Sequence, residues 1–428
     1  MRNYRPVSLL SISSKICEKM ISKRVYNHVK CVLSEHQHGF LPGRSCETNL
    51  SVLLHEARLA FNEARQMDIV YTDFSKAFDK VKHKFLVYKL SKYGIQNTLL
   101  DWFSSYLIGR TQVVTVKGCR SNSVSVSSGV PQGSQLGPLC FILYLNDIFK
   151  NFESKSLGFA DDLKLYKVIR NHTDSLSLQD DIDLLSEWSE KWKMSLNYAK
   201  CVVLRLSLKR LPIDTVYKIG SHELELVNSY SDLGVILDTK LTFTPHVTSI
   251  ISDSRRLLGM LKRFGKGLST AALIAVYTAF VRTKLEYASI VWNSIGKVNS
   301  DKLEAVQRNF IRYLCYVQNV IFDDISYNDL CVKFNLPTLE KRRNYFDLVF
   351  LHKSVNAIFD CQPIFNLHIR SRSTRQIRTF NEPGGRVKFT QHSLFNRIPR
   401  LYNTFYQTLP IFNISASSFK RKAKRVCF

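Results

Sequence analysis

The 428-residue sequence has no cysteines spaced C-x-x-C and no cysteine–histidine cluster at zinc-binding spacing. Its ten cysteines are scattered, which favours reduced thiols in an intracellular compartment over a disulfide framework. No apolar amino-terminal segment followed by a cleavage site is evident, so a secretory signal is not expected. The longest apolar helical stretch, residues 271–281, is too short to cross a bilayer, and no membrane association is predicted.

Negative charge is also scarce, with 35 Asp and Glu against 61 Lys and Arg, a formal net charge of +26. Such an excess favours a polyanionic partner, either nucleic acid or an acidic membrane surface. Residues 331–428 contribute +14 of this charge, from 18 basic and 4 acidic residues, with Tyr and Phe interleaved. This region is either a solvated basic surface, which includes a nuclear-import run, or a surface that follows phosphates and stacks bases. Its basic clusters are Lys341–Arg343, Arg370–Arg378 and Lys420–Arg425.

The stretch from Leu157 to Tyr166 alternates apolar and other residues on both sides of Asp161-Asp162. This alternation predicts a tight β-hairpin that carries two carboxylates at its tip. Asp is a common turn former, so the pair by itself needs no function. The rest of the chain supplies the reason to assign one.

A third carboxylate, Asp73, follows a predicted buried strand over residues 67–71. If this strand and the hairpin share one sheet, Asp73 converges with Asp161 and Asp162, and the repulsion between them requires a divalent metal. Mg²⁺ prefers carboxylate oxygen and keeps open positions for phosphate. Two such ions roughly 3.5–4 Å apart would suit an in-line phosphoryl displacement. In a basic protein, this predicts nucleotidyl transfer on a nucleic acid.

The remaining patterns predict a mixed helix and sheet protein with a domain boundary near residue 240. A strand is expected over residues 4–10 and a hairpin over residues 111–126, with a Gly/Pro-rich loop at 128–138. A second hairpin is expected to join residues 224–227 and 233–237. Strand 202–206 is also expected. Helical spacing predicts helices over residues 12–29, 48–64, 85–93, 99–107, 139–149, 176–193, 247–264, 271–286 and 300–317.

Four motifs occur in the order and spacing of reverse transcriptases, and look most like those of non-LTR retrotransposons of the arthropod jockey type. They are Asp73-Phe74-Ser75-Lys76-Ala77-Phe78-Asp79, Ser128-Gly129-Val130-Pro131-Gln132-Gly133, Phe159-Ala160-Asp161-Asp162 and Leu196-Asn197-Tyr198-Ala199-Lys200. Segments 5–10 and 39–45 resemble finger motifs of that family. The resemblance covers roughly residues 3–320, and the ordered set is far more specific than an isolated F-A-D-D.

The resemblance implies an α+β right-hand polymerase fold, with fingers, a palm built on an antiparallel sheet, and a helical thumb. Fingers and palm are expected in residues 1–240, a thumb-like region in 241–330, and a basic nucleic-acid-binding region in 331–428. The implied activity is RNA-directed DNA polymerisation with two Mg²⁺ ions, or Mn²⁺ as an alternative. The implied partners are an RNA template, a DNA primer or target and deoxynucleoside triphosphates, in the nucleus and cytoplasm.

Residue roles follow from the same resemblance. Asp73 and Asp161 are expected to be the principal metal ligands, with support from Asp162 and the Phe74 carbonyl. Phe78 would lie beneath the incoming sugar and exclude a 2′-hydroxyl, although by itself it is equally consistent with core packing. Lys200 would either donate a proton to the departing pyrophosphate or offset its charge. Other expected contacts are Gln132 and Gly133 at the nucleotide and template, Arg5 and Arg44 at phosphates, and Leu233-Gly234-Val235 at the primer end.

The chain also departs from the family pattern. Relatives carry an endonuclease domain and more of the fingers ahead of the segment that Arg5 begins, and neither an RNase H-like acidic set nor a zinc knuckle is recognisable here. The alternative hypothesis is therefore a truncated, catalytically silent relic that binds nucleic acid. A template-dependent RNA polymerase is a third hypothesis, which Phe78 disfavours.

Overall fold

The computed structural model describes residues 7–322, 324–360, 379–380 and 384–428. The predicted roles of Arg5 and of the Arg370–Arg378 cluster therefore lie outside the described residues. The chain divides into two compact units. The first, here called the sheet unit, comprises Met1–Ser45, Gln66–Arg205 and Leu211–Val227, and the second, the helical unit, comprises Cys46–Arg65, Leu206–Arg210 and Asn228–Phe428.

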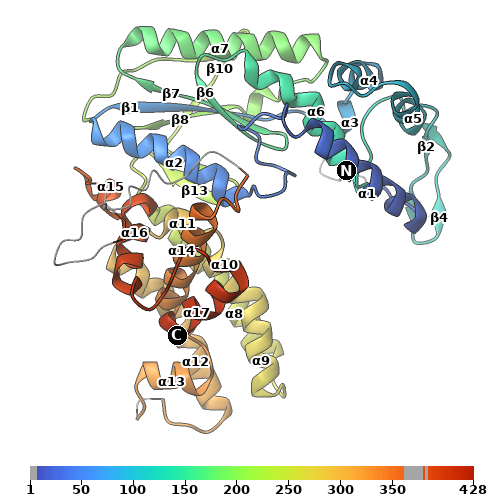
Figure 1. Ribbon diagram of the computed structural model, residues 1–428. Coiled ribbons are helices and arrows are strands. Elements are labelled where there is room, and N and C mark those ends of the chain that lie inside the picture. The colour runs from blue at the N-terminus through green and yellow to red at the C-terminus, as the bar shows by residue number, and fades with distance from the viewer. Residues whose placement is uncertain (1–6, 323, 361–378, 381–383) are drawn as a thin grey trace. The chain divides into compact units, whose positions relative to one another are not determined.

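The sheet unit combines helices with a central sheet and short peripheral strands (Figure 1). Its elements are α1 (Ile12–Val29), β1 (Gln66–Thr72), α3 (Ala77–Lys80), α4 (His83–Lys92), α5 (Asn97–Leu107), β2 (Thr111–Gln112), β3 (Thr115–Val116), β4 (Cys119–Arg120), β5 (Val124–Ser125), α6 (Gly137–Leu145), η1 (Asn146–Lys150), β6 (Lys155–Phe159), β7 (Asp162–Ile169), α7 (His172–Lys191), η2 (Tyr198–Lys200), β8 (Val202–Leu206), β9 (Lys218–Ile219), β10 (His222–Glu223) and β11 (Glu225–Val227).

The central sheet has the strand order β11-β8-β1-β7-β6. All seven residues of β1 are buried, and the strand pairs antiparallel with β7 from Gln66 opposite Ile169 to Thr72 opposite Leu163. β6 and β7 form the predicted hairpin. α7 runs along this sheet (Figure 1), and Asn171 caps its first turn by accepting from the Asp174 amide.

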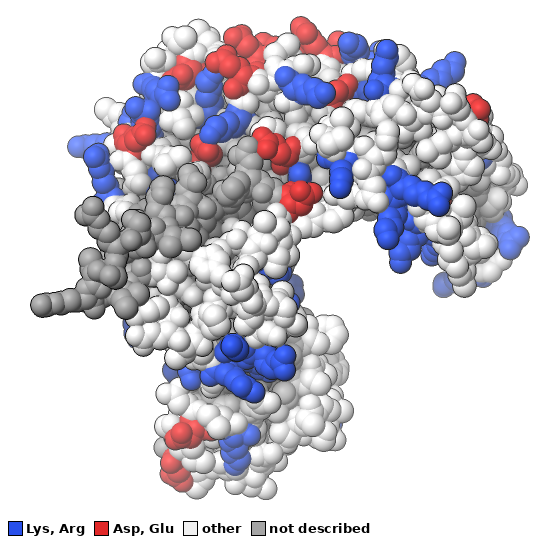
Figure 2. All heavy atoms as spheres, in the orientation of Figure 1, with Lys and Arg blue, Asp and Glu red and all other residues white. Residues whose placement is uncertain are grey.

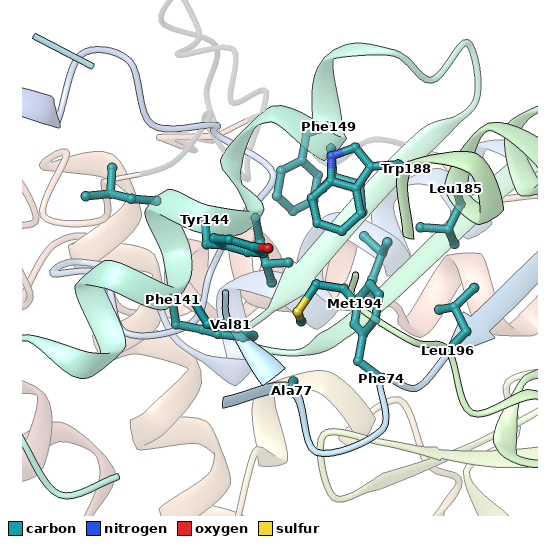
Figure 3. Close-up of a cluster of buried hydrophobic side chains, with 14 of the residues drawn as sticks. Phe74, Ala77, Val81, Phe141, Tyr144, Phe149, Leu185, Trp188, Met194 and Leu196 are labelled. Carbon is teal, nitrogen blue, oxygen red and sulfur yellow. The ribbon is translucent and has the colours of Figure 1, made fainter. Parts of the chain in front are cut away.

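The core of the sheet unit includes Phe74, next to Asp73, and Leu163, next to Asp162. Figure 3 shows Phe74, Trp188, Met194 and Leu196 gathered in this cluster. Phe74 directly follows Asp73 and is 4% exposed, so hydrophobic burial of its ring fixes the backbone next to the Asp73 carboxylate. Trp188 is buried, and its indole nitrogen donates to Asp147.

The helical unit consists mainly of helices with one small hairpin. Its elements are α2 (Cys46–Asn62), β12 (Ser229–Asp232), β13 (Val235–Asp238), α8 (Thr244–Phe264), α9 (Thr270–Val276), η3 (Tyr277–Arg282), α10 (Thr283–Glu286), α11 (Ser289–Trp292), α12 (Lys297–Val317), α13 (Tyr327–Lys333), α14 (Leu339–Val355), α15 (Lys388–His392), α16 (Leu394–Phe405) and α17 (Ala416–Cys427). Within the described ranges, every helix is too short or too polar to cross a lipid bilayer.

The helix predicted over residues 271–286 is interrupted by a π-helical turn, η3. Its buried residues, Leu273, Tyr277, Val281 and Leu285, recur at intervals of four. An α-helix of 3.6 residues per turn would rotate such a series steadily off one face, whereas a wider π turn keeps it aligned. Tyr277 consequently stacks on Phe310 of α12, with ring centroids 4.0 Å apart.

Two predicted β-elements differ from the structure, the first because it forms no strand and the second in its pairing. The strand expected over residues 4–10 is described from residue 7 onward, and residues 7–10 belong to no strand. The backbone hydrogen bond that they make to another segment is the one from the Ser8 amide to the Gln132 carbonyl. The hairpin expected between 224–227 and 233–237 is also wrong. β11 instead pairs in parallel with β8, and β12 pairs with β13 through a two-residue turn, Leu233-Gly234, that has positive φ at both positions.

Candidate active site

Backbone register brings the three predicted carboxylates to one end of the central sheet. The β1–β7 ladder ends with Thr72 opposite Leu163, so the next pair of positions along the same ladder is Asp73 and Asp162. The β6–β7 ladder closes with Phe159 opposite Asp162, which leaves Ala160 and Asp161 as a two-residue turn. The expected convergence of Asp73 with the hairpin tip is thereby confirmed for the backbone.

The Asp73 carboxylate is held from the side of the sheet that carries residues 195–200. Its Oδ2 atom accepts from Asn197 Nδ2 at 3.0 Å and lies 3.2 Å from Lys200 Nζ. The main chain is tied at the same place, since the Asn197 amide donates to the Asp73 carbonyl at 2.7 Å. Lys200 is 67% exposed, so its ammonium reaches the carboxylate from solvent. These contacts orient Asp73, and sequence patterns predicted no role for Asn197.

The Phe74 carbonyl points away from this segment. Phe74 forms an antiparallel bridge with Leu196 in which Asp73 and Ser75, on either side of it, make the hydrogen bonds. Because successive backbone groups of an extended segment point to opposite sides, the Phe74 carbonyl faces the β7 side, where the hairpin tip lies. This direction agrees with its predicted role as a metal ligand.

Three carboxylates and a backbone carbonyl form a donor set of hard oxygen atoms, which suits a divalent cation such as Mg²⁺ or Mn²⁺. Among the residues that the structure describes, no three His, Cys, Asp or Glu side chains already converge as a closed metal site. The fit of these residues to a metal therefore rests on backbone placement and donor chemistry.

Phe78 has packing partners that fix the orientation of its ring. It stacks on Phe141 at a centroid distance of 4.3 Å and an interplanar angle of 14°, and meets Phe40 edge-on at 6.0 Å. The side chain is half-buried, so part of the ring packs in the core and part of it is exposed to solvent. The structure thus accommodates both interpretations that the sequence left open.

The Gly/Pro-rich loop at 128–138 is docked on the segment that follows Asp73. The Val130 amide donates to the Phe78 carbonyl at 2.9 Å, and Gln132 Nε2 lies 3.3 Å from Asp79 Oδ1. Gly133 has φ of +105°, and a Cβ there would come within 2.9 Å of the Ser8 carbonyl, so glycine is required. Gln132 and Gly133 therefore lie in the same unit as Asp73 and are positioned through residues 78–79.

Arg44 stabilises the loop that precedes α2. Its Nη1 atom donates to the carbonyls of Ser34, Glu35 and Gln37, at distances between 2.6 and 3.1 Å. These bonds close the loop on itself. A contact of Arg44 with phosphate stays a prediction.

His38 in this loop predicts acid sensitivity of the sheet unit. Burial lowers its pKa from 6.5 to about 3, so the folded protein keeps the imidazole neutral while the unfolded chain takes up a proton below pH 6.5. The free energy of unfolding should therefore fall with pH, by about 1 kcal/mol between pH 7.5 and 5.5. Urea titrations followed by Trp fluorescence will measure this, and His38→Gln should reduce the difference. Equal pH dependence in both proteins would contradict the assignment.

In the helical unit, the predicted primer-end segment is the turn between β12 and β13. The Tyr287 hydroxyl donates to the Leu233 carbonyl at 2.9 Å, and its ring lies against Gly234. The Leu233-Gly234-Val235 segment therefore has a fixed conformation, and its contact with a primer stays a prediction.

The basic clusters of the carboxy-terminal region differ from one another in exposure. Arg343 of the Lys341–Arg343 cluster is 2% exposed and donates to Asn293 and Ser300, and Arg342 pairs with Glu286. The interpretation of these two arginines as phosphate-tracking residues was wrong, because α14 turns them toward neighbouring helices. On α17 the basic residues are exposed, while Phe419, Ala423 and Cys427 are buried. In Figure 2, Asp and Glu on the visible face of the sheet unit gather mainly over α7.

Comparison with known proteins gives the family. Residues 1–259 match the family model described as reverse transcriptase (RNA-dependent DNA polymerase). The chain is 28% identical over 365 residues to a probable RNA-directed DNA polymerase from transposon X-element of Drosophila melanogaster, covering 82% of this chain and 40% of the relative. It is 30% identical over 328 residues to the RNA-directed DNA polymerase from mobile element jockey of Drosophila funebris, covering 72% of this chain and 35% of the relative.

The chain thus spans about two fifths of the length of the curated relatives it matches. Among solved structures, apo telomerase from Candida tropicalis matches with a TM-score of 0.43 and 12% identity, over 96% of this chain and 61% of that one.

The family model and the curated relatives confirm the predicted resemblance to polymerases of jockey-type, non-LTR retrotransposons, and with it the α+β right-hand polymerase fold class. Members of this family generally use divalent metals. The antiparallel pair β1 and β7 brings the acidic motifs to one end of the mixed central sheet. Because the family model covers more than half of its length, the chain belongs to the reverse transcriptase (RNA-dependent DNA polymerase) family.

Proposed function

We propose that this chain carries an RNA-directed DNA polymerase, which adds deoxynucleotides to the 3′-hydroxyl of a primer along an RNA template. The observation that carries the proposal is the β1–β7 register, which sets Asp73 beside the Asp161-Asp162 turn in a chain of the reverse transcriptase family. Acidic groups from two distant motifs have no structural reason to meet there, because like charges repel.

The metal site we propose uses Asp73, Asp161, Asp162 and the Phe74 carbonyl for two Mg²⁺ ions, with Mn²⁺ as an alternative. Metal bound there supplies Lewis-acid activation of the primer hydroxyl and stabilisation of the leaving oxygen. Asn197 and Lys200 hold the Asp73 carboxylate through its Oδ2 atom. Lys200 is exposed beside Asp73, where it would donate a proton to the pyrophosphate or offset its negative charge.

The nucleotide pocket we propose is lined by Phe78, Gln132 and Gly133, with Arg44 and Arg5 at phosphates. Support comes from the docking of the 128–138 loop on residues 78–81, which brings Gln132 and Gly133 close to the segment that carries Phe78. The stacked partner Phe141 keeps the Phe78 ring from rotating, so that ring can act as a wall beneath the sugar.

We propose that residues 1–240 form the fingers and palm, residues 241–330 a thumb-like region, and residues 331–428 a nucleic-acid-binding region. The exposed face of α17 suits binding to a phosphate backbone, because it carries the basic residues of the helix. Phe419, Ala423 and Cys427 lie on the buried face. The DNA primer or target would meet the protein in the nucleus, and the RNA template in the nucleus or cytoplasm.

Primer extension tests the proposal directly. The purified chain, an RNA template with an annealed DNA primer, and deoxynucleotides should give extended primer with Mg²⁺ or Mn²⁺ and none after chelation with EDTA. Ribonucleotides should be used poorly. Binding that weakens steeply with salt but never yields extension would instead support the alternative, a silent nucleic-acid-binding protein.

A further inference from the structure

Residues 36–40 run along the outer edge of β6 and across the tip of the β6–β7 hairpin. Gln37 forms a parallel bridge with Gly158, in which the His38 amide donates to the Gly158 carbonyl at 2.8 Å. The Gly158 amide in turn donates to the His36 carbonyl at 2.9 Å. This short segment therefore extends the sheet beyond β6, at the strand that leads into the acidic turn.

The first residue of the acidic turn has an uncommon backbone conformation. Ala160 has φ of +58°, a left-handed value that a two-residue hairpin demands and that L-residues other than Gly, Asn and Asp adopt reluctantly. Such a conformation persists only where the surroundings hold it. Since Asp161 follows immediately, whatever holds Ala160 also sets the direction of the Asp161 carboxylate.

The side chain of Gln37 provides this hold. It is 1% exposed, and its amide group meets both backbone polar groups of Ala160. Oε1 accepts from the Ala160 amide at 3.0 Å, and Nε2 lies 3.3 Å from the Ala160 carbonyl. Oε1 also accepts from the Gly39 amide at 2.8 Å, which ties the clamp to its own loop.

Gly39 presses on the same peptide from outside. A Cβ at this position would lie 2.2 Å from the Ala160 nitrogen and 2.9 Å from the Phe159 carbonyl carbon. Both contacts are to backbone, so no side-chain movement can relieve them. Glycine at position 39 therefore allows the loop to approach the turn closely.

We propose that Gln37 is a positioning residue for the catalytic carboxylates, holding the Ala160–Asp161 peptide so that Asp161 faces Asp73 in the geometry that metal binding requires. This inference rests on the proposed polymerase function for its consequence, but the clamp itself is testable without catalysis. It also explains why a buried glutamine stands two residues before Gly39-Phe40.

The test uses Gln37→Met, which keeps a similar volume and removes both hydrogen bonds, and Gly39→Ala, which adds one methyl group against the turn. Gln66→Met is the matched control. Gln66 is also fully buried and bonds a backbone amide and carbonyl, those of Ile213, but lies at the opposite end of the β1–β7 ladder. Loss of folding stability common to buried glutamines will therefore appear in both Met variants.

Hydrogen exchange of the metal-free protein gives the first readout. Amides of the turn 159–162 should exchange at least about tenfold faster in Gln37→Met and Gly39→Ala than in wild type, and at the wild-type rate in Gln66→Met. Equal protection of the turn in Gln37→Met and Gln66→Met would overturn the inference, whatever the activity of the protein.

Metal binding and kinetics give the second readout. Mn²⁺ affinity, measured by the loss of the free-ion electron paramagnetic resonance signal, should weaken about tenfold in Gln37→Met, in line with losses at groups that orient ligands. The kcat of primer extension should fall about 10²-fold while KM for deoxynucleotide changes little. Wild-type values of both quantities in Gln37→Met would overturn the inference. Equal Mn²⁺ affinity in Asp161→Asn and in wild type would instead overturn the proposed metal site.

Discussion

Asp161→Asn is expected to lower the rate of primer extension by about 10³-fold or more, while leaving the protein folded. Asparagine has nearly the same shape as aspartate but lacks the negative charge that holds a divalent cation and balances the transferring phosphate. The turn places Asp161 next to Asp162, the position opposite Asp73, so removing the charge of Asp161 also relieves repulsion. The free energy of unfolding should therefore stay unchanged or rise slightly.

The matched control is Asp180→Asn on α7, an exposed aspartate of the same unit. Single-turnover extension on an RNA template, measured with saturating Mg²⁺, compares the two variants with wild type. Asp180→Asn should retain wild-type rates. If Asp161→Asn extends primers as fast as wild type, the assignment of the acidic turn to catalysis is wrong.

Phe78→Val is expected to raise the use of ribonucleotides relative to deoxynucleotides by about 10²-fold. The ring is held face-to-face by Phe141 and edge-on by Phe40, so it is a rigid wall that cannot swing away from a 2′-hydroxyl. Replacing it with the shorter valine opens room for one oxygen atom. Steric discrimination of this kind corresponds to about 1–3 kcal/mol.

Competition between the two nucleotide classes in one extension reaction measures this ratio. Phe85→Val controls for lost packing, since Phe85 is also half-buried against the same core and contacts Trp192 edge-on. That control should lose stability but keep the wild-type preference for deoxynucleotides. An unchanged preference in Phe78→Val would assign the ring to core packing alone.

Local patterns predicted most elements of the sheet unit correctly. The alternation around Asp161-Asp162 predicted the β6–β7 hairpin, and the apolar run before Asp73 predicted β1. These predictions succeeded because period and turn chemistry are properties of a few neighbouring residues. The meeting of Asp73 with the turn needed one further assumption, a shared sheet, and the β1–β7 register satisfies it.

Pairing between distant segments was harder to predict. The 224–227 segment reads as half of a hairpin, yet β11 joins β8 in parallel. The Lys341–Arg343 cluster reads as a nucleic-acid contact, yet Arg343 is buried among Asn293 and Ser300. In both cases the pattern describes the segment correctly, while its partner is chosen by the packing of other elements.

The sequence alone determined the identities and order of the acidic motifs, the hairpin that carries two of them, and the basic character of the chain, since these depend on composition and short-range periodicity. Only the tertiary structure decided that Asn197 and Lys200 hold Asp73 and that Gln37 clamps the Ala160 peptide. Gln37 and Ala160 are 123 residues apart, and a hydrogen bond over such a distance leaves no periodic trace in either segment. It forms because folding of the whole unit brings a buried amide to a strained turn whose polar groups would otherwise lack partners.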